Sequence, residues 1–365
     1  MYSHTQHAAG TYFVTGAVEA LSVEELVMDT STKASVALRR NPLRFSRGLV
    51  TVIVALFLLV LAGFVFAPSS VSSGAVQGML PFAAVLAIIA LGQTLVVMQG
   101  GIDLSVPGSV SLVIVLVTHQ AYGDDAKVLP VALLALGAAL LTGLGNGFLI
   151  GRLGLNPIVA TLGTNALLYA AVLAVSGGTP RETTRLLARL AGGTTIGVPH
   201  AVYVAVLATA VTSVLVKKTV AGRRFEAVGA NGLAAWASGL RVEGFRAGGY
   251  VFAQVLYWLG ALMLAGILNK PTAYQGDGYL LASVAAVVLG GTSLLGGRGN
   301  LVATALAALF LIQLDQFVLA LGLDYAGKTL VQSAAFAIGV ALYTINWARL
   351  RRRFATKRPE VTVAT

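Results

Sequence analysis

Long apolar stretches alternate with short polar segments along most of the chain. A helix that crosses the hydrocarbon core of a bilayer needs about 20 mainly apolar residues. Ten stretches are close to this length, and they cover residues 49–67, 75–98, 105–122, 128–150, 158–176, 200–216, 248–268, 280–296, 300–321 and 326–347. The pattern predicts an all-α integral membrane protein with about ten transmembrane helices, some of them broken by glycine-rich segments.

The composition excludes a water-soluble fold. Hydrophobic residues make up 57% of the chain and charged residues only 11%, whereas soluble domains have about 45–50% and about 25%. The 42 glycines lie among leucine, valine and alanine, which is typical of closely packed membrane helices. The chain has no cysteine, which excludes disulfides, thiolate nucleophiles and cysteine-ligated metal sites.

The distribution of basic residues predicts the orientation in the membrane. With the N-terminus in the cytoplasm, 19 of the 25 lysines and arginines fall on the cytoplasmic side, as the positive-inside rule requires. We therefore interpret the net charge of +11 as topological and expect no nucleic-acid partner. The expected parts are a cytoplasmic tail over residues 1–48, a transmembrane domain over 49–347 and a basic cytoplasmic tail over 348–365.

One external segment does not follow this rule. Residues 177–199 are predicted to lie outside, although Arg181, Arg185 and Arg189 belong to them. The spacing of these arginines predicts a short amphipathic helix.

The longest internal connection, residues 217–247, has basic flanks around the small-residue stretch GANGLAAWASGL. Two interpretations are equally compatible with its residues. It is either a solvated basic loop that binds anionic lipid head groups, or a helical segment that docks on a cytoplasmic partner.

Two glycine-rich segments interrupt the apolar stretches. In the first, Gly100 and Gly101 precede Asp103 and Ser105, which are suited to cap the helix that follows. This segment is either a helix break that needs protein or water around it or a tight polar turn at the membrane surface. The second contains Gly290, Gly291 and Thr292. Span parity places both segments on the same side of the membrane, so they do not support an inverted repeat.

Several polar side chains occur inside the predicted spans, where contact with lipid is unfavourable. They are Gln93, Gln99, Asn146, Thr161, Thr164, Asn165, Gln254, Gln313, Asp315 and Gln316. Amides and hydroxyls suit a neutral, hydroxyl-rich solute, and they suit hydrogen bonds between helices equally.

Four motifs, in order and in register, resemble one family. They are GGIDLSVPGSV (100–110), LNPIVATLGT (155–164), GRRFEAVGANGLAAWASGL (222–240) and AAVVLGGTSLLGGRGN (285–300). Together they resemble the permease subunits of bacterial ABC importers for ribose, xylose, arabinose and related sugars. Members of this family are multi-pass subunits of the plasma membrane without catalytic activity, and both termini are expected in the cytoplasm.

The resemblance implies partners and site residues. It implies an ABC ATPase subunit that binds ATP and Mg²⁺, a periplasmic or lipid-anchored sugar-binding protein, a second permease copy or paralogue, and no cofactor in this chain. The docking residues would be Asn231, Ala234, Ala235 and Gly239. The candidates for the pathway and its helix breaks are Gly100, Gly101, Asp103, Ser105, Asn165, Gly290, Gly291 and Thr292.

The chain departs from the family pattern at several positions. Leu233 replaces the glutamate that usually contacts the ATPase, and Leu280 and Ala282 stand where many members carry acids. Asp315 occupies a position where asparagine or glycine is expected, and its role is open. These departures bear on the docking contact and on the choice of sugar.

Two catalytic signals do not carry a function. Residues 322–329 match the phosphate-binding pattern G-x-x-x-x-G-K-[ST] letter by letter, but a phosphate loop needs a strand and a helix in a soluble domain. The histidines His4, His7, His119 and His200 form no ligand set. We therefore expect neither an enzyme nor a metal site.

The sequence leaves several alternatives open. A gradient-driven secondary transporter would need no ATPase, and a branched-chain amino-acid permease would share the importer architecture. The identity of the sugar, and whether the dimer has one or two kinds of permease, do not follow from the residues. Met28 would open a shorter chain that keeps every apolar stretch.

Overall fold

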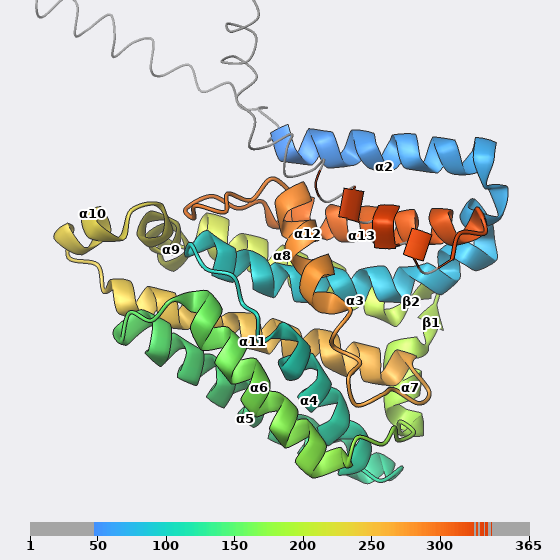
Figure 1. Cartoon of the computed structure of the whole chain (residues 1–365), viewed down its shortest axis with the longest axis horizontal. Helices are drawn as coiled ribbons and strands as arrows, with labels where there is room; N and C mark the ends of the chain where they lie inside the picture. Colours follow the sequence, from blue (N-terminus) through green and yellow to red (C-terminus); the bar gives the residue numbers. More distant parts are fainter. Residues whose placement is uncertain (1–46, 325, 328, 332, 335–336, 338–365) are drawn as a thin grey trace, which may run out of the picture. The chain divides into compact units, whose positions relative to one another are not determined.

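The computed structural model describes residues 47–324 and, beyond them, 326–327, 329–331, 333–334 and 337. The predicted N-terminal tail apart from residues 47–48, the whole predicted C-terminal tail and most of the tenth predicted span lie outside the described residues. The described part is helical, apart from an antiparallel pair of two-residue strands, β1 (Thr194–Thr195) and β2 (Val198–Pro199) (Figure 1). The prediction of an all-α membrane protein is confirmed at this level.

Within the described residues, seven helices are long and apolar enough to cross a membrane. They are α2 (Arg47–Phe66), α3 (Ser73–Met98), α5 (Val128–Gly147), α6 (Pro157–Ser176), α8 (His200–Lys218), α11 (Val242–Ile267) and α13 (Leu301–Ala320). Two shorter apolar helices are α4 (Val106–His119) and α12 (Tyr279–Leu289). The connecting elements are two short 3-10 helices, η1 (Pro68–Val71) and η2 (Asp125–Lys127), the π-helical turn η3 (Phe148–Arg152), and the α-helices α7 (Arg185–Gly192), α9 (Val220–Ala230) and α10 (Gly232–Ala237).

The expected count of about ten spans is not confirmed. α4 has 14 residues and α12 has 11, so at 1.5 Å per residue they measure about 21 Å and about 16 Å, less than the hydrocarbon core of about 30 Å. Both stretches looked longer in sequence because their apolar residues continue into turns. The turn after α12 is enforced at Gly291, which has a positive φ of 78°.

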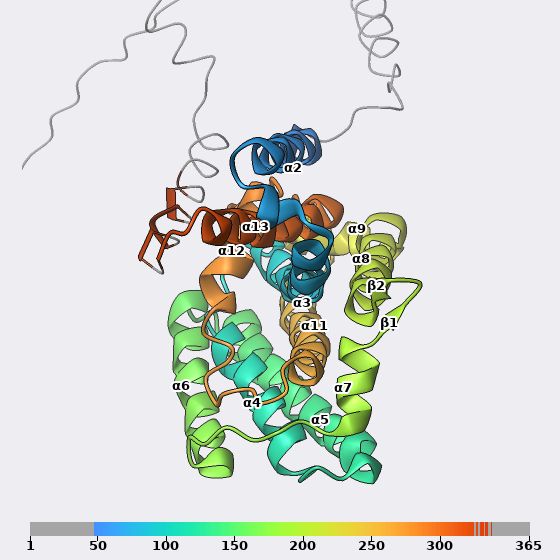
Figure 2. The same ribbon diagram turned by 90° about the vertical axis from the view of Figure 1, so that its right-hand side faces the viewer.

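α3 lies at the centre of the bundle and contacts α8, α11, α12 and α13 (Figures 1 and 2). Its hydrophobicity continues around the whole helix, as expected for a helix that faces protein on all sides. Most of its residues are buried, whereas α2, α5 and α6 expose many apolar side chains. Those exposed faces are what a lipid-facing helix requires.

α3 and α11 approach closely because glycines occupy the contact. A Cβ atom added at Gly92 would lie 2.5 Å from a ring carbon of Tyr257, and one at Gly260 would lie 2.8 Å from a side-chain carbon of Ile89. The Tyr257 hydroxyl donates a hydrogen bond of 3.0 Å to Gln93 Oε1. The centre of the bundle is therefore closed by packing and by one buried polar pair.

We predict that Gly92→Val lowers the free energy of unfolding by about 1–3 kcal/mol, because the added methyl groups overpack the contact with Tyr257. The matched control is Gly163→Val on α6, where no atom lies within 4 Å of an added Cβ. Thermal unfolding in detergent should separate the two variants. Equal melting temperatures would contradict the close packing.

Candidate functional site

Three segments that are distant in sequence are in backbone contact at one end of the bundle. They are the end of α3 at Met98, the end of α9 at Gly229–Ala230, and Gly296–Gly297 in the segment after α12. The Gly297 amide donates to the Met98 carbonyl oxygen at 2.8 Å. A Cβ added at Gly296 would lie 2.6 Å from the Gly229 carbonyl oxygen. We call this contact the glycine junction.

Side chains at these glycines would prevent the contact. A Cβ added at Gly229 would overlap the Met98 carbonyl oxygen, and one at Gly297 would lie 2.5 Å from the Cα of Ala230. Gly296 and Gly297 also adopt positive φ angles of 89° and 75°, which favour glycine. The two glycine-rich segments thus lie at the same end of the bundle, as span parity predicted, and α9 contacts both.

The segment predicted over residues 217–247 consists mainly of two short helices, α9 and α10, and α11 begins earlier than expected, at Val242. Of the four predicted docking residues, Asn231 caps α10, because its Oδ1 accepts a hydrogen bond from the Ala234 amide at 3.0 Å. Ala235 faces the protein, and Ala234 is exposed. Gly239 ends the segment with a positive φ of 81° in open space.

α10 presents two large apolar side chains that the docking prediction did not include. Leu233 is 77% exposed and Trp236 is 69% exposed. A tryptophan in a run of small residues was the available signal for Trp236. Because α10 lies at an end of the bundle (Figure 1), this exposure favours a protein contact over a lipid contact.

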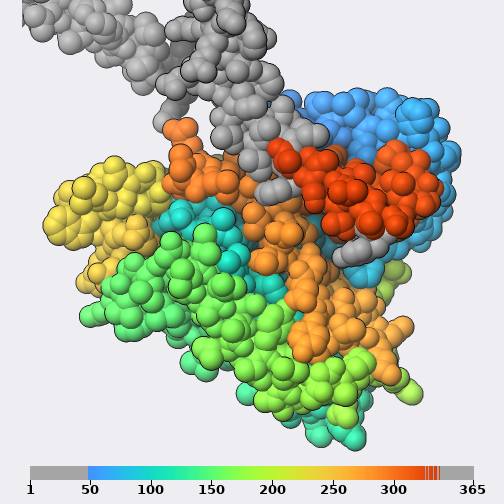
Figure 3. Space-filling model, viewed as in Figure 1, coloured from blue at the N-terminus to red at the C-terminus, as the bar shows by residue number. Residues whose placement is uncertain are grey.

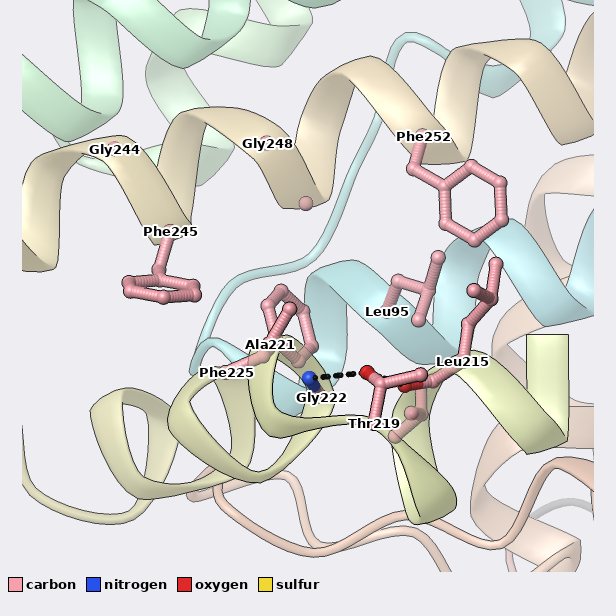
Figure 4. Close-up of a pocket in the computed structure, with 12 residues that line it drawn as sticks. Leu95, Leu215, Thr219, Ala221, Gly222, Phe225, Gly244, Phe245, Gly248 and Phe252 are labelled. Carbon is pink, nitrogen blue, oxygen red and sulfur yellow. Dashed lines mark hydrogen bonds between the residues drawn. The ribbon is translucent and has the colours of Figure 1, made fainter.

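A cavity of about 280 Å³ lies behind α9 (Figure 4). Its apolar lining comes from α3, α8, α9 and α11, and includes Phe225, Phe245 and Phe252. Thr219 Oγ1 accepts a hydrogen bond of 3.0 Å from the Gly222 amide at the start of α9. Gln99, the residue after α3, donates a hydrogen bond of 2.9 Å from Nε2 to the Phe225 carbonyl. α9 is therefore tied to α3, and the cavity lies between α9 and α11 beside the Phe225 ring, which contacts α11 at Gly249.

The second predicted glycine segment leads from α12 into the junction. A Cβ at Gly290 would lie 2.7 Å from the Thr304 amide nitrogen, and Gly291 has a positive φ. Thr292 is buried, and its Oγ1 accepts a 3.4 Å hydrogen bond from the Asn300 amide. Asn300 in turn caps α13 through the Ala303 amide at 3.1 Å. These residues therefore fix the reversal between α12 and α13.

The first predicted break runs from the junction to the start of α4. Gly100 has a positive φ of 80°, and a Cβ at Gly101 would lie 2.7 Å from the Tyr250 hydroxyl. Asp103 and Ser105 are fully buried, so protein surrounds the polar side chains of this segment, as a helix break in a membrane needs. Ser105 precedes α4, but its side chain makes no capping bond, so the cap expected of it is wrong. Instead its hydroxyl and its amide both donate to Asp103 Oδ1, at 2.5 Å and 2.8 Å.

A buried polar cluster surrounds this break. We define it as Asp103, Ser105, Asn146, Gln254 and Thr164. Asn146 on α5 and Gln254 on α11 donate to Ser105 Oγ at 3.1 Å and 3.2 Å. Thr164 on α6 donates to Asn146 Oδ1 at 2.6 Å. One short loop is thus hydrogen-bonded, directly or through Asn146, to three helices, as suits buried polar groups in a membrane protein.

α6 holds the same break at two further points. Thr161 Oγ1 accepts from the Leu104 amide at 2.9 Å, and Asn165 Oδ1 accepts from the Gly108 amide in the first turn of α4 at 2.8 Å. The sequence singled out Asn165, and the structure places it against α4. The predicted residues therefore form two groups, one at the glycine junction and one around the polar cluster.

Among the described residues, no group of three histidine or acidic side chains lies close enough together to hold a metal ion. His200 is hydrogen-bonded to Thr195 and to the Leu190 carbonyl, at the small strand pair. Lys328 of the phosphate-loop match lies outside the described residues.

Comparison with known proteins gives the family. Residues 75–343 match the model described as "Branched-chain amino acid transport system / permease component". This chain belongs to that permease family. The predicted membership of an ABC importer permease family is confirmed, and in this family the permease is the non-catalytic membrane subunit, with ATP bound by the partner ATPase.

Curated relatives cover most of the permease. A ribose import permease of Bacillus subtilis is 33% identical over 290 residues, which are 79% of this chain and 90% of the relative. A probable ABC transporter permease of Sinorhizobium fredii is 35% identical over 298 residues, 81% of this chain and 89% of the relative. An autoinducer 2 import permease of Escherichia coli is 34% identical over 245 residues, 66% of this chain and 70% of the relative. No solved structure matches the permease significantly.

We predict that Asp103→Ala lowers the free energy of unfolding by about 1–3 kcal/mol, because it leaves the buried Ser105 amide without its acceptor. Asp103→Asn keeps Oδ1 and should cost less. Thermal unfolding of the detergent-purified permease measures both. Equal losses would show that the charge of Asp103 matters rather than its acceptor geometry.

The glycine junction generates a second prediction. Gly229→Ala should reduce ATP-driven uptake about tenfold or more, because overpacking at this backbone contact costs about 1–3 kcal/mol. The control Gly244→Ala on α11 adds a methyl group whose nearest neighbour is 3.9 Å away. Uptake is compared at equal amounts of inserted permease. Normal uptake by the Gly229 variant would contradict the need for this contact.

Proposed function

We propose that this permease forms the translocation pathway of an ATP-driven importer for a sugar of the ribose type. The glycine junction carries the proposal. The helices α9 and α10 expose apolar side chains to an outside partner. At the glycine junction, α9 also contacts the end of α3 and the segment after α12 through backbone atoms. This arrangement is suited to transmit a movement of a bound subunit into the bundle. The sugar class is supported by the relatives named for ribose import.

The proposed assembly follows from the two ends of the bundle. The end with α9 and α10 would face the cytoplasm and dock an ABC ATPase through Leu233, Trp236 and the turn at Gly239. The end with α7 would face a periplasmic or lipid-anchored sugar-binding protein. We further propose ten membrane passages, counting α4, α12 and the stretch 326–347, with both termini in the cytoplasm of a bacterium and two permeases side by side.

The coupling step needs contacts that differ between the two states of the pathway. The cavity of Figure 4, which is lined by α3, α8, α9 and α11, supplies the room for such a change. The Lys217–Glu226 ion pair joins the end of α8 to α9, so the change would be a tilt of α9 about the α8–α9 corner. The junction would then move the ends of α3 and of the α12–α13 segment together.

A branched-chain amino-acid substrate is the second candidate, because the matching family model is described by that transport system. A permease for such a substrate would share the docking segment and the junction. Transport of ribose but not leucine would decide between the two.

The experiment is reconstitution in proteoliposomes. The permease alone should not accumulate radiolabelled ribose under an imposed proton or sodium gradient, and adding the ATPase, the binding protein and ATP should start uptake. Accumulation by the lone permease would support a gradient-driven transporter instead.

The docking surface is tested in the same system. Trp236→Ala should reduce co-purification of the ATPase about tenfold, since a buried aromatic anchor contributes about 2 kcal/mol or more. Gly239→Trp should reduce it too, because a side chain is strained at the positive φ of this turn. The control Ile196→Ala changes another strongly exposed apolar residue, in the turn between β1 and β2. Retained ATPase in both variants would contradict docking through α10.

A further inference from the structure

The segment between α11 and α12 enters the bundle without forming a helix or a strand. Its start is fixed by the Thr183 amide, which donates to the Asn269 carbonyl at 3.1 Å, near α7. Its far end is fixed at α4, where the Gly276 amide donates to Ser111 Oγ at 3.0 Å. A Cβ at Gly276 would overlap the Pro107 carbonyl in the first turn of α4. The segment thus descends from the α7 end to the point where α4 begins.

This segment borders α6 on an open face of the subunit, visible in orange beside the green α6 (Figures 2 and 3). The contact on α6 is Tyr169, seven residues before the end of the helix at Ser176, which corresponds to about 10 Å along its axis. With α6 as a membrane span, as its length and composition allow, the contact lies within the depth of the membrane. Irregular backbone at this depth is tolerated only where it is covered by protein or lines water.

Three side chains meet at this point. The Tyr169 hydroxyl donates a hydrogen bond to the Asp277 carboxylate. The rings of Tyr169 and Tyr274 lie 5.5 Å apart at 53°. Asp277 is exposed and Tyr274 is 43% exposed. No lysine or arginine of the described residues forms an ion pair with Asp277.

An exposed carboxylate at this depth is unfavourable against lipid and needs water or a polar partner. The half-exposed ring of Tyr274 adds an apolar surface next to the Asp277 carboxylate, which is a hydrogen-bond acceptor. This combination suits a sugar, which has C–H groups on the faces of its ring and hydroxyl donors at its edge. A branched-chain amino acid would instead bring its own carboxylate against Asp277.

We infer that Tyr169, Tyr274 and Asp277 form a sugar-contacting site on the wall of a water-filled pathway. Asp277 accepts hydrogen bonds from sugar hydroxyls, Tyr274 covers a face of the ring, and Tyr169 positions the carboxylate. The inference rests on the proposed function and assigns the place in the chain where the sugar is held.

The absence of cysteine allows a direct test of the water-filled wall. Asp277→Cys and Tyr274→Cys are introduced singly into the permease, assembled with its ATPase and binding protein in liposomes. A charged, water-soluble thiosulfonate should modify both about tenfold faster than a cysteine at Leu141, an exposed position on α5, because thiolates form in water and not in lipid. Ribose should slow the reaction at residues 274 and 277. Equal rates at residues 141, 274 and 277, or no protection by ribose, would overturn the site.

Transport kinetics test the contact with sugar. Asp277→Asn and Tyr169→Phe should raise the KM for ribose or lower kcat about tenfold in the assembled transporter. The control Tyr203→Phe removes a hydroxyl that donates to the Thr195 carbonyl on another face. Wild-type kinetics in both test variants would overturn the inference while leaving the proposed function intact. Absence of ATP-driven ribose uptake by the wild-type assembly would overturn the proposed function itself.

Discussion

The architecture depends on backbone lying directly against backbone at the glycine junction. Gly229, Gly296 and Gly297 bring α9, the end of α3 and the segment before α13 closer than any side chain permits. Such a contact has no rotamers to rearrange, so a displacement on one side is passed on rather than absorbed. α9 lies at the surface and α3 lies at the centre of the bundle. At the junction their backbones are in direct contact, with no side chain between them.

The polar cluster fixes the inner end of the loop that runs from the glycine junction to α4. Residues 99–105 leave the junction and end at Ser105, where Asn146 and Gln254 hold the loop between α5 and α11. One end of the loop is thus fixed by glycine packing and the other by hydrogen bonds. α4 begins in the interior for this reason, and its first turn supports the segment around Gly276.

The sequence predicted the helices better than the contacts between them. Apolar length was sufficient to locate α2, α3, α5, α6, α8, α11 and α13, and the arginine spacing was sufficient to locate α7. The apolar pattern overestimated the lengths of α4 and α12, since apolar residues continue into the turns at Tyr122 and Gly291, where φ is positive and the helices have ended. Asp103, Ser105 and Asn165 were singled out by residue type, but their partners come from distant helices and have no local signal. The same holds for Tyr169 and Asp277, separated by 108 positions.

The burial of α3 has a consequence for how the chain can vary. Nearly every side chain from Ala83 to Met98 is enclosed by protein, so each substitution there changes the volume of a filled interior. α2 has the opposite setting, since Phe57, Phe64 and Phe66 are largely exposed and one apolar side chain serves there nearly as well as another. Apolar replacements on the exposed face of α2 should therefore be tolerated, while the residues of α3 from Ala83 to Met98 are each fixed by the neighbours that enclose them.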